Sequence, residues 1–350
     1  MIRVSVVILN WNGRKLLEQF LPSVLQHTLS EESNVVVADN ASADDSLEFL
    51  RSHYPDLPVI TLDKNYGFAD GYNKALQQID SEYLVLLNSD VETSSDWLQP
   101  LISYMDTHPE VAAVQPKIRS YKEKKMFEYA GAAGGFIDRY GYPFCRGRIL
   151  HVVEEDHNQY NTEIPIFWAT GACFCIRKKD YTEAGGLDGR FFAHMEEIDL
   201  CWRLNARGRR VMCIPDSVVY HVGGASLNQD NPKKMYLNFR NNLLMLYKNI
   251  PQRGYLSTFI IRFFFDILAC IRLSLKGNFK SVWAVVDAYK DFRKMRPSYE
   301  PFRKENLRKT IIEHIPTQYR RSILMDFYFK GKKSYSAVNR GGNSITRNGS

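Results

Sequence analysis

The residues best suited to chemistry stand where an apolar run gives way to polar residues. Residues 84–87 are Leu-Val-Leu-Leu, and the lack of alternating polar residues is typical of a strand buried on both faces. Asn88, Ser89 and Asp90 follow directly. A carboxylate there is costly to bury without a partner such as a cation. Asp90 therefore indicates a site for Mg²⁺ or Mn²⁺, which proteins commonly hold with one or two carboxylates and with substrate phosphate oxygens.

A second protein ligand is needed, because one carboxylate holds such a cation weakly. His221 follows the apolar residues 218–220 and is a candidate, since Mn²⁺ accepts imidazole nitrogen as well as oxygen. A purely structural role is the alternative for this histidine.

The densest acidic group lies in residues 194–199, His-Met-Glu-Glu-Ile-Asp. Glu196 and Glu197 open a helical pattern, and acidic residues in a first turn are favoured by the helix dipole. A structural role is one explanation. The other is a general base, because a carboxylate kept ionised there could take a proton from an attacking hydroxyl. Asp199 precedes Arg203 by four residues, which indicates an ion pair along the helix.

Asp39 ends another apolar run and is followed by Asn40 and Ser42. Such a carboxylate can accept hydrogen bonds from a nucleobase or a ribose, or it can cap a helix. Neither the G-x-G-x-x-G fingerprint nor a P-loop is present, so the diphosphate of a nucleotide would need a cation as counter-charge.

The surrounding pattern alternates short apolar runs with helical stretches, which predicts a parallel sheet with helices on both faces. Ligands of such sheets lie at the carboxyl ends of the strands, where Asn10 and Asn12 also stand. We expect strands at 4–9, 34–38, 58–62, 83–87, 112–115, 164–177 (bent at Gly171), 210–214 and 217–221. We expect helices at 15–27, 69–78, 181–187 and 197–208. A further helix through residues 47–50 is expected to begin at an N-cap, either Ser42 or Asp44. A flexible loop is expected at 129–142.

Charge divides the chain into two parts. Residues 1–230 hold 22 Lys+Arg and 32 Asp+Glu, whereas residues 231–350 hold 24 and 7. The basic part could lie against an anionic membrane or nucleic acid. Nucleic acid is disfavoured, because the basic residues are spread out without a recognition motif. The six cysteines form no CxxC, and no signal peptide precedes the first strand, which together indicate a reducing cytoplasm.

Residues 255–275 are strongly apolar, but Arg262, Asp266 and Arg272 interrupt them, so we predict no transmembrane helix. These charged residues fall on one arc of a helix and apolar residues fill the rest. The pattern predicts an amphipathic helix that lies on a membrane or packs on a partner. A helix facing the core of this protein is the alternative. A second helix at 282–293 and a disordered tail at 334–350 are expected.

Seven stretches match one family in order across residues 4–226. They are VSVVILNWNG, VVVADNASADDS, NYGFADGYNKAL, YLVLLNSDVE, ATGACFCIRKKDYTEAGGLDGRFF, EEIDLCWRLNARGRRV and VVYHVGGAS. The chain thereby resembles the family 2 glycosyltransferases with a GT-A fold, particularly the rhamnosyltransferase-like branch. Residues 231–350 are not covered by this pattern.

The resemblance implies an α/β protein with a GT-A fold: a Rossmann-like, mostly parallel sheet flanked by helices. The residue pattern after 231 adds a C-terminal amphipathic helical region to this expectation. The expected parts are a catalytic domain at 1–230, a basic membrane-associating region at 231–333 and the tail. The implied reaction is a metal-dependent, inverting transfer of a sugar from a nucleoside-diphosphate sugar to an acceptor hydroxyl in cell-surface polysaccharide or glycolipid synthesis. The acceptor would be lipid-linked or an oligosaccharide, and the protein peripheral at the inner face of the cell membrane.

Roles carry over position by position. Asp90 is the last residue of a DXD-like motif and would bind the metal. Asn88 stands where many members have Asp, which makes His221 more strongly indicated as the second metal ligand. Glu197 takes the place of the family's catalytic Asp, with Glu196 as the alternative base. The implied donor-binding residues are Asn10, Asn12, Asp39, Asn40, Asn65, Gly67, Asn73, Asn88 and Ser89. The implied acceptor-site residues are Trp168, Gly171, Ala172 and Asp199.

Two functions of other kinds stay open from the sequence. A sugar nucleotidylyltransferase shares this sheet-and-carboxylate chemistry but usually has a Gly-rich phosphate loop, for which residues 10–13 are a poor match. A non-catalytic partner protein with the same fold is the other, because Asn88 and Glu197 depart from the family pattern. The sequence does not indicate the donor sugar or the oligomeric state.

Overall fold

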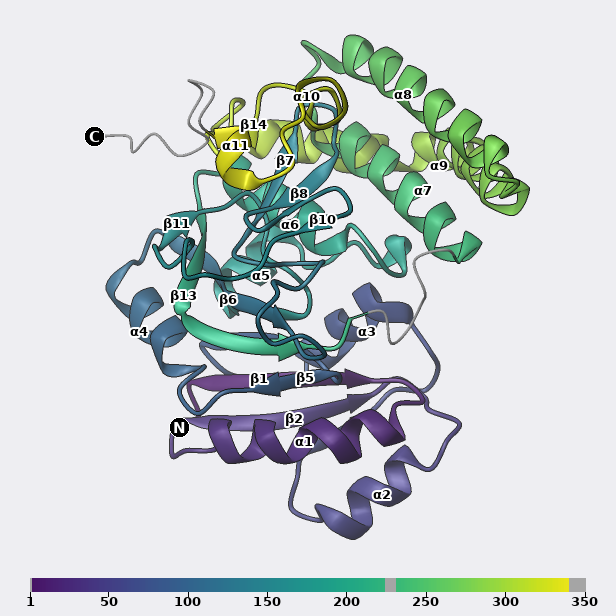
Figure 1. Cartoon of the computed structure of the whole chain (residues 1–350). Helices are drawn as coiled ribbons and strands as arrows, with labels where there is room; N and C mark the ends of the chain where they lie inside the picture. Colours follow the sequence, from purple (N-terminus) through teal and green to yellow (C-terminus); the bar gives the residue numbers. More distant parts are fainter. Residues whose placement is uncertain (1, 224–230, 340–350) are drawn as a thin grey trace.

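A computed structural model describes residues 2–223 and 231–339. Within them, a nine-stranded sheet has the order β11-β13-β6-β12-β4-β1-β2-β3, with β5 beside β13 (Figure 1). Its strands are β1 (Val4–Asn10), β2 (Ser33–Asp39), β3 (Val59–Thr61), β4 (Tyr83–Asn88), β5 (Val91–Thr93), β6 (Val111–Ser120), β11 (Ile164–Pro165), β12 (Cys173–Arg177) and β13 (Arg210–His221). The strands β3, β2, β1 and β4 are parallel. Their carboxyl ends therefore meet at one edge, as predicted.

Strand β4 is buried on both faces, which confirms the prediction for this run. Leu84 and Leu86 face one core, and Val85 and Leu87 face the other. The first core is shared with α3 (Gly67–Leu76), α5 (Lys178–Ala184), α6 (Glu196–Ala206) and α7 (Pro232–Asn249). The second is shared with α1 (Arg14–Thr28), α2 (Ser46–His53) and α4 (Gln99–Thr107). The sheet is thus the middle layer of an α/β sandwich.

Several predicted elements differ because pairing partners far apart in sequence decide them. Residues 164–177 form two strands with different partners, since β11 pairs with β13 and β12 pairs with β4 and β6. The two strands expected within 210–221 are instead one, β13, with an irregularity between Ile214 and Val218. Helix α2 begins after Asp45 and has no side-chain cap, so neither Ser42 nor Asp44 is its N-cap.

The predicted loop at 129–142 contains a buried strand. A second sheet, β10-β9-β8-β7-β14, runs through β7 (Gly135–Asp138), β8 (Pro143–Cys145), β9 (Arg148–Ile149), β10 (Val152–Val153) and β14 (Gln318–Tyr319). Gly135 lies against the Trp168 ring, where a Cβ atom would come within 2.2 Å of ring carbons. The absence of a side chain, which suggested flexibility, here permits close packing.

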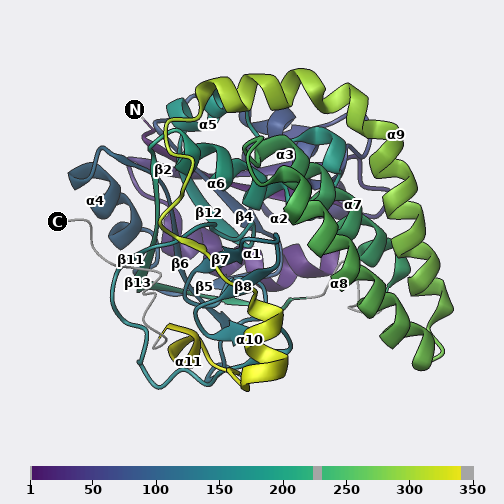
Figure 2. The same cartoon turned by 90° about the horizontal axis from the view of Figure 1, so that it is seen from above.

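The C-terminal region is helical and returns to the second sheet, where β14 pairs with β7. Its helices are α8 (Tyr255–Leu275), α9 (Phe279–Lys309), α10 (Ile323–Lys330) and α11 (Tyr335–Asn339). Helix α9 is far longer than the predicted 282–293, contains Pro297 and Pro301, and curves over the molecule (Figure 2). Helix α11 occupies the start of the predicted disordered tail, with Tyr335 buried; residues 340–350 lie outside the described residues.

Helix α8 turns its polar side toward the protein. Its buried residues are Thr258, Arg262 and Asp266, whereas its Phe, Ile and Leu side chains are largely exposed. Arg262 and Asp266 form a buried ion pair of 2.9 Å, and Tyr142 and Tyr289 donate to Asp266 at 2.9 and 2.7 Å. Tyr255 and Phe259 at the start of α8 pack against the core, whereas most of its other apolar residues do not face the core of this protein. No helix in the described part of the chain is long and apolar enough to cross a bilayer, in agreement with the prediction.

Candidate active site

The carboxyl end of β4 meets the end of β13 at a buried acid–histidine pair. Nε2 of His221 lies 3.1 Å from Oδ1 of Asp90 and 3.3 Å from Nδ2 of Asn88. Both Asp90 and His221 are 6% exposed. Burial opposes charge on each, but the hydrogen bond between them lowers the pKa of Asp90 and contributes to raising that of His221 to about 10. The sequence placed these residues 131 positions apart, and the structure brings them together.

Glu128 joins this pair and was missed from the sequence. Its Oε1 lies 3.5 Å from Nδ1 of His221, and the residue is 4% exposed. The distance is that of an ion pair rather than a good hydrogen bond, and Nδ1 has no hydrogen-bond partner among the described residues. A carboxylate behind a metal-binding histidine is a recurring arrangement that orients the ring. Glu128 lies outside every matched motif, so no signal in the sequence pointed to it.

The donor set of this pair fits one divalent cation only in part. Asp90 and His221 present an oxygen and a nitrogen close enough to coordinate the same ion, and Mn²⁺ accepts both types. Within residues 2–223 and 231–339, no group of three or more His, Cys, Asp and Glu side chains could by itself hold a metal ion. Remaining positions would thus fall to water and substrate phosphate, as is usual for Mg²⁺ and Mn²⁺ with nucleotides.

Glu196 and Glu197 begin α6 and carry unsatisfied carboxylate atoms. The Oε2 atom of each is buried and has no hydrogen-bond partner in the described part of the chain. Burial raises the pKa of both carboxyls, and the charge of Glu197 raises that of Glu196 further, to well above its ordinary value. Glu196 is 4% exposed, whereas Glu197 is only half-buried. A carboxyl of raised pKa with one oxygen that lacks a hydrogen-bond partner, on a residue that is not fully buried, is suited to proton transfer.

The segment before these glutamates has a strained backbone. Phe192, His194 and Met195 all have positive φ, at 66°, 73° and 74°, a conformation that costs non-glycine residues energy and persists only when neighbours impose it. The Phe192 carbonyl also accepts hydrogen bonds from the backbone N–H groups of Phe68 and Ala69 at 2.7 and 3.2 Å. These contacts fix the turn against the start of α3.

Asn241 of α7 holds the same turn from the other side. Its Nδ2 donates to the carbonyls of Phe191, Ala193 and His194 at 3.0, 2.9 and 2.8 Å, and the residue is fully buried. No role was expected for Asn241 from the sequence, although three polar residues in a row, 240–242, on a buried helix are an unusual signal. The helical region beyond the matched motifs therefore helps to shape the catalytic turn.

Replacing Asn241 by Asp should disturb the turn before Glu196, because a carboxylate oxygen would then face the three carbonyl oxygens that the amide now binds. We expect kcat to fall about 10²-fold, the effect of displacing a catalytic group by about 1 Å, with a smaller change in the KM for the donor. Asn238→Asp is the matched control, since Asn238 lies on the same helix and its amide donates to the Lys234 carbonyl of that helix. Equal losses of kcat in both variants, or a loss explained by a lower melting temperature alone, would contradict a positioning role.

The polar residues expected to bind the donor form two linked turns at the ends of β1 and β2. Asp39 accepts from Asn10 at 3.0 Å and from the Ser42 side chain at 2.6 Å. Asn40 donates to Asn65 at 3.1 Å. Further contacts place Asn12 against Ala43, at 2.7 Å, and the N–H of Gly67 on Asn65, at 2.8 Å. The structure thus gathers these residues at the same sheet edge as Asn88, Ser89 and Asp90.

Gly171 and Ala172 connect the two carboxylate groups. The Asn88 N–H donates to the Ala172 carbonyl at 3.0 Å, and the Gly171 N–H lowers the pKa of Glu197, partly offsetting burial. A Cβ atom at Gly171 would come 2.9 Å from the Phe68 ring. These two expected acceptor-site residues therefore lie between β4, which leads to Asp90, and the expected base.

Three expected site residues are instead committed to the structure of the fold. Trp168 is 3% exposed, and its Nε1 donates to the Phe136 carbonyl at 2.8 Å. The Asn73 side chain makes hydrogen bonds to both Leu187 backbone groups and to Tyr181, at 2.6 to 3.0 Å. Trp168 and Asn73 thus connect elements of the fold.

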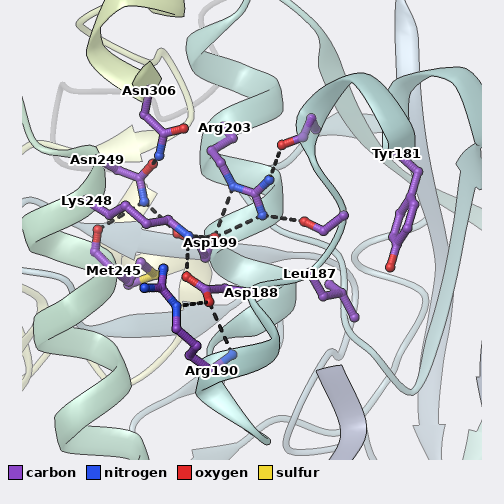
Figure 3. Close-up of polar contacts among 12 residues, drawn as sticks. Tyr181, Leu187, Asp188, Arg190, Asp199, Arg203, Met245, Lys248, Asn249 and Asn306 are labelled. Carbon is purple, nitrogen blue, oxygen red and sulfur yellow. Dashed lines mark hydrogen bonds and ion pairs between the residues drawn. The ribbon is translucent and has the colours of Figure 1, made fainter. Parts of the chain in front are cut away.

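Asp199 is the third of these residues, and Figure 3 shows it within a network of polar side chains. Its carboxylate is fully buried and contacts Arg203 at 3.0 Å, Lys248 at 2.7 Å and Asn249 at 2.7 Å. The predicted pair with Arg203 is therefore confirmed, and the expected acceptor contact is replaced by a structural role. Lys248 also binds Asp188 at 2.8 Å. The network ties α7 to α6 and to the segment that precedes the catalytic turn.

Comparison with known proteins identifies the fold and the family. Solved structures with the same fold include GalNAc-T7 with UDP, GalNAc and Mn²⁺ (TM-score 0.56, 18% identity), covering 71% of this chain and 49% of that one. Another is S. aureus TarS 1–349 in complex with UDP-GlcNAc (TM-score 0.55, 17% identity), covering 88% and 89%. This chain thus spans about half of the first neighbour and most of the second. The fold is that of the GT-A glycosyltransferases.

The family model Glycosyl transferase family 2 matches residues 5–183. The chain belongs to that family and is a glycosyltransferase, which confirms the resemblance of its motifs. A curated relative is the N-acetylglucosaminyl-diphospho-decaprenol L-rhamnosyltransferase of Mycobacterium tuberculosis, 23% identical over 259 residues, which are 69% of this chain and 83% of the relative.

Proposed function

We propose that the protein transfers a sugar, with inversion, from a nucleoside-diphosphate sugar to a hydroxyl of a lipid-linked or oligosaccharide acceptor in cell-surface polysaccharide or glycolipid synthesis. The observation that carries this proposal is the pair of unsatisfied carboxylates, Glu196 and Glu197, near the edge of the sheet that holds Asp90 and His221. Family membership favours this reaction over nucleotidyl transfer.

The residues divide into three tasks. Glu197 takes the proton of the acceptor hydroxyl as its oxygen attacks the anomeric carbon; the bond from that carbon to the diphosphate breaks, and its electron pair leaves with the nucleoside diphosphate. Asp90 and His221 would hold Mn²⁺ or Mg²⁺, which supplies a counter-charge for that diphosphate. The turns at Asp39 and Asn40 bind the nucleoside.

The apolar face of α8 supports a location at a membrane. Leu256, Phe264 and Leu268 are 68%, 60% and 60% exposed, and the region from 231 onward is strongly basic. An apolar face flanked by Lys and Arg suits the interface of an anionic bilayer. We place the protein peripherally at the inner face of the cell membrane, where a lipid-linked acceptor would be within reach.

Nucleotide release from a panel of nucleotide sugars tests the reaction class. With Mn²⁺ or Mg²⁺ and a crude lipid extract as acceptor, we expect release from one donor and loss of release in EDTA that is restored by adding the metal back. Release that is insensitive to EDTA would contradict the metal dependence. The absence of nucleotide release with every donor would favour a non-catalytic role.

A further inference from the structure

The helical hairpin of α8 and α9 contains an apolar groove that the proposed reaction does not use. It has a volume of about 750 Å³, within the usual range for small-molecule sites. Most of its lining is aliphatic or aromatic, contributed by both helices. Examples are Ile267 and Ile271 on α8, and Phe279, Val282 and Val286 on α9. Figures 1 and 2 show this hairpin extending from the body of the protein.

The polar groups at the base of the groove are already satisfied. Asp266 accepts from Tyr289 across the groove at 2.7 Å, and its charge is matched by Arg262 at 2.9 Å. A ligand in the groove therefore needs no polar group at its base. The hydrogen bond from Tyr289 of α9 to Asp266 of α8 also holds the two helices together, so that the groove is part of the folded hairpin.

The remaining charges along the groove are positive. Lys290 and Arg293 line it and are exposed. Lys290 contacts Asp287 at 3.0 Å, but both side chains are largely exposed and such pairs contribute little. An apolar channel with two cations at its side complements a hydrocarbon chain that carries a phosphate.

A second hollow lies next to the same helix α9. It has a volume of about 460 Å³, lies between α7 and α9, and shares Lys290 with the groove. Lys233, which also lines it, lies 5.5 Å from the ring of Phe192. Phe192 belongs to the strained turn before Glu196. Lys290 thus stands at both hollows, and the second hollow has a lining residue near the turn that precedes Glu196.

We propose that the groove between α8 and α9 binds the hydrocarbon chain of a phosphate-linked lipid acceptor, with the phosphate at Lys290 and Arg293. This inference rests on the proposed function and adds to it a binding site for the acceptor's lipid part. The chain would lie in the groove, and the hydroxyl-bearing head would extend from the phosphate at Lys290 toward the catalytic turn.

Binding of geranylgeranyl phosphate, measured by calorimetry below its micelle concentration, tests the proposal on the full-length protein. We expect binding by the unmodified protein and weakening by at least about tenfold in Cys270→Trp, which fills the groove, because each methylene excluded costs about fourfold. Leu268→Trp is the matched control, since Leu268 lies on the same helix outside the groove lining. It should bind as the unmodified protein does. Lys290→Gln with Arg293→Gln should weaken binding, whereas Lys294→Gln should not.

Equal binding by Cys270→Trp and Leu268→Trp would overturn the proposal, as would binding of inorganic phosphate as tight as that of the isoprenoid phosphate. Vesicles of phosphatidylcholine with ~20% phosphatidylglycerol that displace the probe would assign the groove to bulk lipid and also overturn it. Nucleotide release is assayed on the same unmodified protein. Intact isoprenoid binding without release from any donor would contradict the proposed function and leave the groove assignment standing.

Discussion

Glu197→Gln is expected to lower kcat by about 10² to 10⁴-fold, the usual contribution of a general base, while leaving the KM for the donor nearly unchanged. The substitution keeps the shape of the side chain but removes its ability to accept a proton. Glu197 is chosen over its neighbour because it is the more accessible of the two. The measurement is steady-state kinetics with donor and acceptor both varied.

Glu196→Gln is the matched comparison. Burial and the nearby charges of Glu197 and Asp199 raise the pKa of Glu196 well above its ordinary value, so it holds a proton more readily and an amide there mimics that neutral form. We expect a small effect on kcat. The opposite ranking of the two variants would make Glu196 the base.

The raised pKa of Glu197 also predicts the direction of the pH dependence. A base must be ionised, so activity is lost as pH falls through its pKa and is retained above it. Because burial raises this pKa, the acidic limb of kcat should lie above the range of an ordinary glutamate. This acidic limb should be absent from the pH profile of the residual activity of the Glu197→Gln variant.

The second large effect is expected from Asp90→Asn. Removing the carboxylate leaves the cation with His221 as its one protein ligand among those identified, and we expect Mn²⁺ affinity in the presence of nucleoside diphosphate to fall by more than about 10²-fold. Electron paramagnetic resonance of free Mn²⁺ measures this directly, apart from turnover. Activity should fall in parallel and should recover in part at high metal concentration.

Glu128→Gln separates direct coordination from support of the histidine. A partner behind a metal-bound histidine typically contributes 10- to 100-fold in metal affinity, so this variant should bind Mn²⁺ more weakly than the unmodified protein but better than Asp90→Asn. The charged form of His221 must lose a proton to bind metal, so affinity should rise with pH. Unchanged affinity in Asp90→Asn would remove this carboxylate from the metal site.

The part of the fold that could be predicted from sequence is the part decided by local pattern. The run 84–87 has one interpretation, a strand buried on both faces, and polar residues directly after it must lie at the sheet edge. Asp90 and the turn at Asp39 followed from that reasoning. The helix at 255–275 has the predicted bounds. The charged residues within it were the reason for not interpreting it as a transmembrane helix.

What could not be predicted depends on contacts between distant residues. The split of 164–177 follows from pairing with β13 on one side and β4 on the other, which no local pattern contains. Trp168 and Asp199 stand next to site residues in sequence, but their side chains point into the fold. Glu128 and Asn241 reach the site through space from segments outside the matched motifs.

The buried ion pair of α8 has a consequence for how deeply the protein can enter a bilayer. A helix with its side chains is about 10–12 Å across, and interfacial helices sink about 5–10 Å. Deeper entry of α8 would carry Arg262 and Asp266 into hydrocarbon and break their contacts with Tyr142 and Asn242, at a cost of several kcal/mol. With α8 on a bilayer as proposed, the pair would limit how deeply the helix sinks and would keep the catalytic turn at one height above the lipid.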